Sequence, residues 1–146
     1  MRIDIRPATP RDLPSAIELL RSAGLPTEDL TAEHLALVAE GEAGVLGVIG
    51  LEAFGDIGLL RSLVVSPLAR GAGVGRSLVA ALESAARKRG IAELWLLTQD
   101  ADAFFSKSSF CVRKRDAAPE AIRGSEEFSR LCPDDAVLMS KRTGSV

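Results

Sequence analysis

A glycine-rich segment, Arg70-Gly71-Ala72-Gly73-Val74-Gly75, carries the clearest chemical signal in this chain of 146 residues. It lies between an apolar run, Leu59 to Val65, and a segment of helical periodicity, Val74 to Arg89. A glycine turn that leads from a strand into a helix leaves backbone N–H groups unpaired, and the helix dipole favours negative charge there. The segment therefore predicts an anion-binding loop whose ligand carries phosphate.

Spacing argues against two nucleotide-binding patterns. A mononucleotide P-loop needs Gly-Lys-Ser/Thr, whereas Gly75 is followed by Arg76 and Ser77. A dinucleotide fingerprint needs a third glycine at position 76 and an acidic residue after the next strand, but Glu93 precedes the apolar run Leu94 to Leu97. A glycine-rich turn without a ligand remains the plain alternative.

Two motifs in the chain resemble those of the GNAT family of N-acetyltransferases. Residues 63–75, LVVSPLARGAGVG, resemble the family's acetyl-CoA pyrophosphate loop, Arg/Gln-x-x-Gly-x-Gly after a strand that ends in Val-x-Pro. Residues 101–110, ADAFFSKSSF, resemble the family's Ala-x-x-Phe-Tyr-x-Lys-x-Gly-Phe. The resemblance extends over nearly the whole chain and implies acetyl-CoA as cosubstrate and an amine as acceptor.

The resemblance also implies which residues hold acetyl-CoA. The strand before the loop would pair its backbone with the pantetheine arm, and an N–H there would polarise the thioester carbonyl. Arg70 and Arg76 would lie near the pyrophosphate. An ordinary exposed arginine in the first turn of the helix explains Arg76 equally well. The expected acetyl-CoA-binding residues are Leu63, Val64, Val65, Arg70, Gly71, Ala72, Gly73, Val74, Gly75, Arg76, Thr98 and Phe105.

Two charged residues interrupt apolar strands and are candidates for chemistry on the acceptor. Glu52 follows the apolar run Val48 to Leu51 and could act as a base through a water molecule, although an exposed strand-end carboxylate fits equally well. Arg61 lies inside the run Leu59 to Leu63, where an unpaired charge would be costly to bury. We expect Arg61 either to pair with Glu52 or to receive a carboxylate of the substrate.

The general acid is the point at which the chain departs from the family pattern. Relatives often use the tyrosine of the second motif to protonate the departing thiolate, but this chain contains no tyrosine and has Phe105 there. Ser109 likewise replaces the usual glycine. The thiolate could leave unassisted, since thiols are acidic, or Thr98 or a water could serve. The predicted catalytic residues are therefore Glu52, Arg61 and Thr98, with the acid left open.

A narrower resemblance concerns the small N-acetyltransferases encoded in arsenic-resistance operons. It rests on residues 58–65 and 96–98 and on a tail pattern over residues 118–133 that includes Leu-Cys-Pro. It implies a small amine acceptor linked to arsenic resistance. Two alternatives stay open, a non-catalytic acyl-CoA sensor and an N-acetyltransferase for proteins or peptides. Relatives are often homodimers, and a homodimer is possible here.

Composition limits the function classes. With 47% apolar and 26% charged residues, the chain is typical of one globular domain over residues 1–146. It contains no long apolar run and no signal pattern, so we expect a cytoplasmic protein without a membrane partner. A net charge of −2 argues against nucleic acid, and the basic cluster Arg113 to Arg115 is expected to be a solvated edge.

Metal binding is not expected from the cysteine and histidine content. Cys111 and Cys132 have no partners at zinc-site spacing, and the chain has only one histidine. Both cysteines are expected to be reduced thiols that are buried or semi-buried.

The pattern of apolar residues predicts an α/β fold with a mixed, mostly antiparallel sheet of six or seven strands and helices on both faces. A meander of three strands precedes the glycine loop, and a short helix is expected around Thr27 to Leu30. The expected strands are Ile3–Ile5, Leu35–Glu40, Gly44–Ala53, Gly58–Val65, Leu94–Leu97, Phe110–Val112 and Ala136–Met139, and the other expected helices span Thr9–Gly24, Val74–Arg89, Ala101–Lys107 and Pro119–Leu131, the last broken near Gly124.

Overall fold

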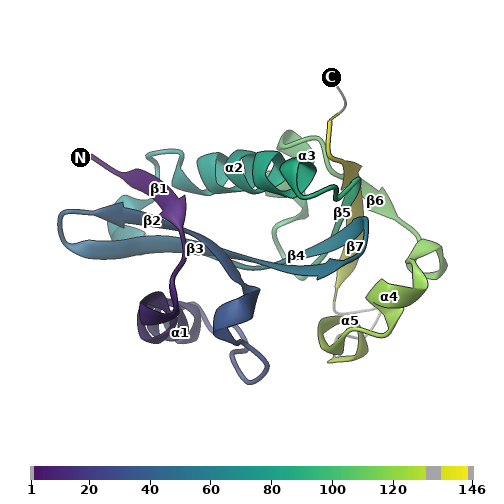
Figure 1. The fold of residues 1–146 in the computed structure, drawn as a ribbon, viewed down its shortest axis with the longest axis horizontal. Helices are drawn as coiled ribbons and strands as arrows, with labels where there is room; N and C mark the ends of the chain where they lie inside the picture. The colour runs from purple at the N-terminus through teal and green to yellow at the C-terminus, as the bar shows by residue number, and fades with distance from the viewer. Residues whose placement is uncertain (1, 131–135, 145–146) are drawn as a thin grey trace. The chain divides into compact units, whose positions relative to one another are not determined.

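The structure is a computed structural model that describes residues 2–130 and 136–144. Figure 1 labels its elements. The helices are α1 (Leu13–Ser22), α2 (Val74–Lys88), α3 (Asp102–Lys107), α4 (Glu120–Arg123) and α5 (Glu126–Arg130). The strands are β1 (Asp4–Pro7), β2 (Leu35–Gly41), β3 (Gly44–Phe54), β4 (Ile57–Val65), β5 (Glu93–Thr98), β6 (Cys111–Arg113) and β7 (Val137–Arg142).

Within the described residues, seven strands form one sheet in the order β1-β2-β3-β4-β5-β7-β6. Strand β4 runs parallel to β5, whereas the pairs β1 with β2, β2 with β3, β5 with β7 and β6 with β7 are antiparallel. The predicted α/β fold with a mixed, mostly antiparallel sheet is therefore confirmed. Most predicted elements are present, with ends that differ by a few residues.

The chain divides into two compact units. The first consists of Met1–Glu52 and Leu60–Ser84, and the second of Ala53–Leu59 and Ala85–Val146. Strand β4 and helix α2 contribute residues to both.

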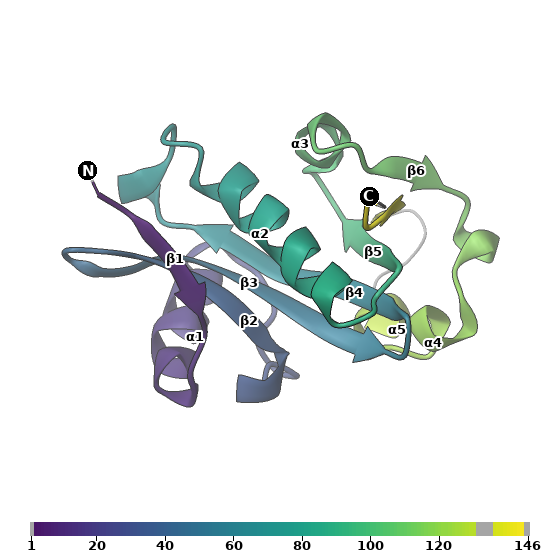
Figure 2. The same cartoon turned by 45° about the horizontal axis from the view of Figure 1, so that its top comes forward.

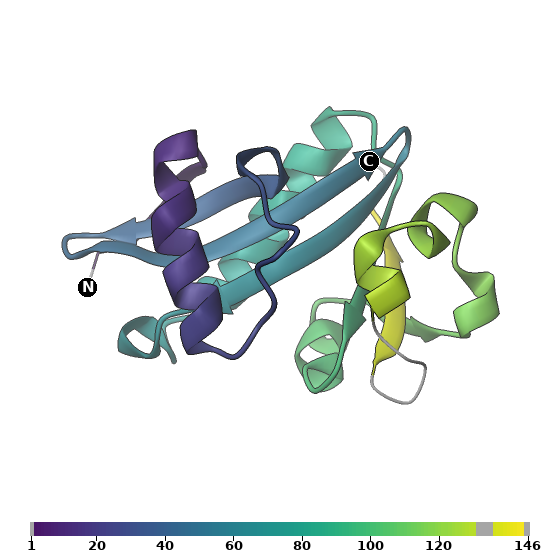
Figure 3. The same ribbon diagram turned by 90° about the horizontal axis from the view of Figure 1, so that it is seen from below.

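In the first unit, helices cover both faces of the sheet, and Figures 1 and 2 show the first-unit part of α2 on the face opposite α1. Figure 3 shows α1 and the segment that follows it against the other face. The α1 face forms a hydrophobic cluster, which we call the α1 cluster. Its buried members are Ala16, Leu20, Leu30, Leu35, Val38, Val48 and Val64.

An ionic network joins β1 to the start of α1. The Asp12 carboxylate accepts hydrogen bonds from the Thr9 backbone N–H (2.8 Å) and from the Arg6 guanidinium (2.9 Å to each oxygen). A 3-10 turn, Pro10–Asp12, follows Thr9 and leads into α1, so the helical segment starts near Thr9 as predicted, although its α-helical part begins at Leu13. Thr9 and Asp12 form a capping box there, and the Thr9 hydroxyl donates to the Asp12 carboxylate at 3.2 Å. These contacts, the Arg6 guanidinium above all, lower the pKa of Asp12 to about 2, and the same pairing raises the pKa of Arg6.

The second unit has a separate core around Trp95. Its buried members are Leu59, Trp95, Ala118, Ile122 and Leu138. The two tail helices, α4 and α5, are separate on either side of Gly124, as the sequence predicts. Arg113 stacks over the Trp95 ring at 5.3 Å and Arg115 over the Phe128 ring at 4.3 Å, so these two basic residues are anchored on aromatic rings and not simply solvated.

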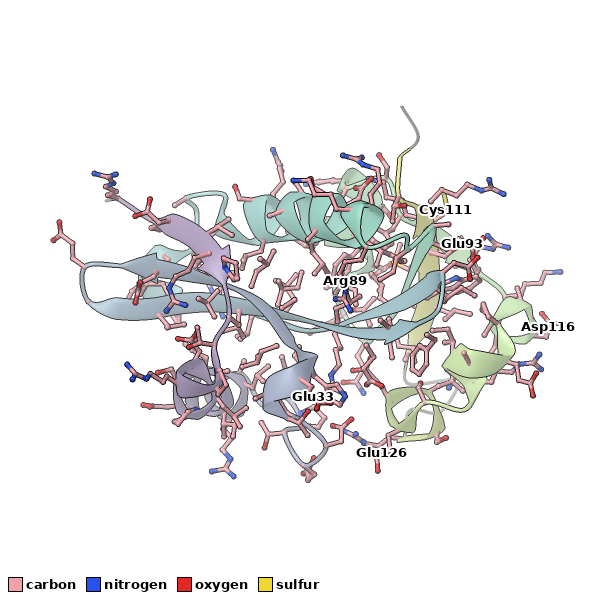
Figure 4. All side chains as sticks on the ribbon, in the orientation of Figure 1. Glu33, Arg89, Glu93, Cys111, Asp116 and Glu126 are labelled. Atoms are coloured by element: carbon pink, nitrogen blue, oxygen red, sulfur yellow. The ribbon has the colours of Figure 1, made fainter. Side chains whose placement is uncertain are left out.

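Two predictions are wrong. Residues 27–30 form a turn closed by the Leu30 N–H to Thr27 carbonyl hydrogen bond (3.1 Å), because Pro26 and the isolated apolar Leu30 give no stripe for a helix. Cys111, labelled in Figure 4, is exposed and not buried or semi-buried as expected. It lies on the short edge strand β6, whose three residues are all exposed. Cys132 lies outside the described residues.

Among the described residues, no helix is long and apolar enough to cross a membrane. In the same part of the chain, no three His, Cys, Asp or Glu side chains lie together so that they could hold a metal ion.

Candidate functional site

The glycine loop between β4 and α2 adopts the conformation that only glycine takes easily. Gly71 has φ +85° and Gly73 has φ +76°, both in the left-handed region. A Cβ at either position would meet no atom within 4 Å, so the requirement for glycine comes from the backbone conformation and not from crowding. The loop is exposed up to Val74, the buried first residue of α2.

Most backbone N–H groups of this loop have no acceptor among the residues that the structure describes. Within the described part of the chain, no hydrogen bond is donated by the N–H of Gly71 or of residues 73–76, whereas Ser77 donates to the Gly73 carbonyl at 3.0 Å. Unpaired donors at the N-terminus of a 15-residue helix favour an anion, because the helix dipole adds to them.

Two arginines flank these donors. Arg70 precedes the loop and Arg76 lies in the first turn of α2, and both are exposed. Neither side chain makes a hydrogen bond or an ion pair with any residue that the structure describes. Their positive charge is therefore available to an anionic ligand, although the exposure of Arg76 equally fits an ordinary surface arginine.

Gly47 on β3 allows the first turn of α2 to pack close to the sheet. A Cβ there would lie 3.2 Å from Leu78 Cδ1, 3.3 Å from the Val64 carbonyl oxygen and 3.4 Å from Val74 Cγ1. The entry to the loop is also fixed, because the Ser66 N–H donates to the Leu46 carbonyl at 2.7 Å. The sheet therefore determines where the loop and the start of α2 lie.

Strand β4 has an irregularity just before the segment expected to bind pantetheine. Ser62 has φ +58°, in the left-handed region that L side chains rarely adopt. After this residue, Val64 is buried and Leu63 and Val65 are partly exposed. Sequence reasoning missed this feature, because serine gives no signal for a positive φ.

Arg61 lies at the centre of a buried ionic cluster that we call the Arg61 cluster. Its Nη1 donates to Asp29 Oδ2 and to Glu52 Oε1, each at 2.7 Å, and its Nη2 donates to Asp29 Oδ1 at 2.9 Å. Its Nε donates to Ser62 Oγ at 3.1 Å. The Arg61 side chain is only 2% exposed, so these contacts compensate the cost of burying its charge.

Of the two alternatives expected for Arg61, the pair with Glu52 is present. The Glu52 side chain is 15% exposed, and within the described residues its second oxygen, Oε2, accepts no hydrogen bond. Glu52 therefore keeps one carboxylate oxygen for another donor. Asp29 was missed by sequence reasoning, since it is 32 positions from Arg61 along the chain and no local pattern connects them.

Gly50 on β3 makes room for the Arg61 cluster. A Cβ at this position would lie 2.7 Å from the His34 carbonyl oxygen and 3.1 Å from the Arg61 carbonyl oxygen. It would also lie 3.2 Å from Arg61 Cγ. Only glycine allows these backbones and the arginine stem to approach so closely.

The two remaining predicted site residues belong to the second unit. Thr98, at the end of β5, is buried, and its hydroxyl oxygen accepts from the Ala101 N–H at 3.0 Å. Phe105 is 5% exposed and makes edge contacts with Phe104 (5.1 Å between ring centroids) and Phe110 (5.7 Å). Phe105 is therefore part of an aromatic core, where it packs α3 against the start of the next strand.

The comparisons with known proteins agree with this geometry. The family model described as acetyltransferase (GNAT) domain matches residues 32–111. No curated protein sequence matches the chain significantly.

Three solved structures illustrate the similarity in fold. N-acetylglutamate synthase from Neisseria gonorrhoeae, complexed with coenzyme A and N-acetyl-glutamate, is 24% identical with a TM-score of 0.84, over 99% of this chain and 36% of that chain. Rv2747 from Mycobacterium tuberculosis, in complex with CoA, is 21% identical with a TM-score of 0.77, over 95% and 98%. The ribosomal-protein-S18-alanine N-acetyltransferase from Escherichia coli is 18% identical with a TM-score of 0.71, over 99% and 96%.

The chain spans about a third of the length of the Neisseria enzyme, so the activity of that whole enzyme is not assigned to this chain. The family model, in contrast, covers more than half of this chain and includes β4, the glycine loop and α2. The chain belongs to the acetyltransferase (GNAT) domain family.

Proposed function

We propose that this enzyme transfers the acetyl group of acetyl-CoA to the amine of a small molecule. The observation that carries the proposal is the exposed glycine loop at the N-terminus of α2, where several N–H groups and two arginine side chains have no partner among residues 2–130 and 136–144. This arrangement suits the pyrophosphate of coenzyme A, which carries two negative charges in a compact group.

The donor would be held by residues of the first unit. The N–H groups of Gly71, Gly73, Val74, Gly75 and Arg76 would bind the pyrophosphate, with Ala72 in the turn between the glycines. The backbone of Leu63, Val64 and Val65 would pair with the pantetheine arm. Acetyl-CoA supplies an activated acetyl group, and an N–H aimed at its carbonyl oxygen would stabilise the charge that develops during transfer.

Glu52 is the proposed general base. Its Oε1 is held by Arg61, while Oε2 has no partner in the described ranges, so Oε2 could take the proton of the attacking amine directly or through a water. The amine nitrogen then forms the new bond to the acetyl carbon, and the bond from that carbon to sulfur breaks. In this arrangement Arg61 orients the base and does not itself receive a substrate carboxylate.

The departing thiolate must gain a proton, and no tyrosine is present to supply it. A thiol has a pKa of about 8.5, so the thiolate is a tolerable leaving group without an acid. Thr98 accepts a hydrogen bond from Ala101, which leaves its own O–H free to donate. We propose a thiolate that leaves unassisted or is protonated by water or by Thr98.

The acceptor is the finer part of the proposal. The Neisseria relative is complexed with N-acetyl-glutamate, a small molecule, whereas the Escherichia coli relative is named for a ribosomal protein. The resemblance of residues 58–65 and 96–98 to enzymes of arsenic-resistance operons favours a small amine linked to arsenic resistance. A cytoplasmic homodimer is part of the same proposal and rests on the resemblance alone.

The proposal is tested in two steps on the purified chain. Titration calorimetry with acetyl-CoA should show saturable binding, and its absence would contradict the donor assignment. A thiol-release assay with amino acids, an amine-bearing organoarsenical, other small amines and a peptide then identifies the acceptor. Turnover of the peptide with none of the small amines would overturn the small-molecule acceptor.

A further inference from the structure

Asp29 is connected to the backbone of β4 through two other side chains. It lies in the turn that follows α1, and its carboxylate accepts from both terminal nitrogens of Arg61, at 2.7 and 2.9 Å. The Nε of the same guanidinium donates to Ser62 Oγ at 3.1 Å. The three residues therefore form one hydrogen-bonded chain from the turn to the strand.

The hydrogen bonds from Asp29 through Arg61 constrain the backbone of Ser62. Its φ of +58° is unfavourable for an L side chain, and such a conformation persists only where neighbouring contacts enforce it. The contact to Arg61 Nε is the hydrogen bond that holds its side chain. Since Asp29 grips both other nitrogens of the guanidinium, Arg61 cannot rotate away from Ser62 without breaking a bidentate ion pair.

The backbone of β4 changes face at this point. The Arg61 side chain reaches Asp29, which is next to Leu30 of the α1 cluster, and Val64 packs in the same cluster. In a regular strand, residues three positions apart lie on opposite faces. The left-handed residue between them therefore acts as a bulge that shifts the alternation by one position. Every N–H and C=O from Leu63 to Val65 takes its direction from that shift.

We propose that Asp29 is a positioning residue for the binding of acetyl-CoA. Through Arg61 it holds Ser62 in the left-handed conformation, and this conformation sets the direction of the backbone of Leu63, Val64 and Val65. The inference rests on the proposed function, because it assigns that backbone to the pantetheine arm. Asp29 itself touches neither the donor nor the acceptor.

Asp29→Asn tests the role by separating kinetic constants. Loss of the charge weakens the grip on Arg61, and we expect the KM for acetyl-CoA to rise about tenfold, in line with one charged hydrogen bond. The KM for the amine should change much less. Glu33→Gln is the matched control, since Glu33 is an exposed carboxylate in the turn before β2, labelled in Figure 4. It should leave both constants unchanged.

Ser62→Gly provides the rescue. Glycine adopts a positive φ at no steric cost, so it keeps the bulge without help from Arg61. The double variant Asp29→Asn with Ser62→Gly should therefore bring the KM for acetyl-CoA back toward the wild-type value. Ser109→Gly is the matched control for this change, because Ser109 also has a positive φ (+73°) but lies in the turn after α3. It should not rescue Asp29→Asn.

Amide hydrogen exchange in the ligand-free protein separates the two proposals. Asp29→Asn should speed exchange at Leu63 to Val65 about tenfold, whether or not acetyl-CoA binds. If calorimetry shows no binding of acetyl-CoA to the wild-type protein, the proposed function fails, and exchange alone then tests the link from Asp29 to β4. Unchanged exchange in Asp29→Asn, or failure of Ser62→Gly to rescue its KM, would overturn the inference.

Discussion

Arg61 and Glu52 lie on neighbouring strands, and Arg61 Nη1 donates to Glu52 Oε1 at 2.7 Å while the second oxygen of Glu52 stays without a partner in the described residues. The ion pair orients the Glu52 carboxylate and leaves its second oxygen available to accept a proton. A base needs such an arrangement, because one oxygen must be fixed and the other must be open to the proton it accepts.

Glu52→Gln should lower kcat by about 10²- to 10⁴-fold, the range typical of a lost general base. The amide keeps an oxygen that Arg61 can still bond, so the fold should be retained. Steady-state thiol release measures kcat, and calorimetry should show unchanged binding of acetyl-CoA. A kcat close to that of the wild type with the true acceptor would show that Glu52 is only a structural partner of Arg61.

Arg61→Leu should destabilise the protein by about 3 to 5 kcal/mol. The change leaves Asp29 and Glu52, whose side chains are 8% and 15% exposed, close together without the cation that pairs them. Urea denaturation measures the free energy of unfolding. Arg2→Ala is the matched control, since the Arg2–Asp4 pair is 3.9 Å apart with side chains 86% and 72% exposed. That control should cost less than about 1 kcal/mol.

Arg70→Ala should raise the KM for acetyl-CoA about tenfold, because the arginine lies exposed and unpaired beside the glycine loop. The free energy of unfolding should not change, which separates ligand binding from folding. Arg21→Ala removes an exposed arginine from the last turn of α1 and serves as the control. Equal effects of the two substitutions on the KM would contradict an anion site at the loop.

Gly50→Ala should destabilise the fold by about 1 to 3 kcal/mol and disturb the Arg61 cluster. The new Cβ would lie 2.7 Å from a backbone oxygen, which cannot move aside as a flexible side chain could. Gly124→Ala is the control, since its Cβ would lie no closer than 3.5 Å to any atom outside its immediate neighbours. Thermal unfolding compares them, and a Gly50→Ala protein as stable as Gly124→Ala would contradict the close approach.

The Asp12 carboxylate should make stability depend on acidic pH. Its pKa falls from 3.8 to about 2 on folding, so the unfolded chain binds more protons between these values. This stabilisation, about 2 kcal/mol, is present in full above pH 3.8 and is lost as the pH falls toward 2.

Urea denaturation at several acidic pH values measures this effect. Asp12→Asn should be less stable than the wild type at neutral pH and should lose less stability on acidification. Asp4→Asn, at a carboxylate 72% exposed, should follow the wild-type curve. If Asp12→Asn and wild type lose equal stability between pH 4 and pH 2, the ion pair with Arg6 does not stabilise the fold.

Local patterns in the sequence determined the elements and the loop. The apolar stripe of α2 and the stop at Gly90 predict a helix whatever the rest of the fold is. Gly71 and Gly73 favour a turn in the left-handed conformation before that helix. These signals act over a few residues, so they can be read directly along the chain. The turn at residues 27–30 could not be predicted in this way, because a segment without a strong apolar stripe depends on tertiary contacts such as the pair of Asp29 with Arg61.

The sequence predicted part of the Arg61 cluster, and only the tertiary structure decided the rest. The sequence indicated that a buried Arg61 needs an anionic partner, and Glu52 was correctly predicted as one. Asp29 became its bidentate partner because the turn after α1 passes close to β4, a relation between segments 32 positions apart. The positive φ of Ser62 has the same origin, since packing and hydrogen bonds enforce a conformation that serine does not prefer by itself.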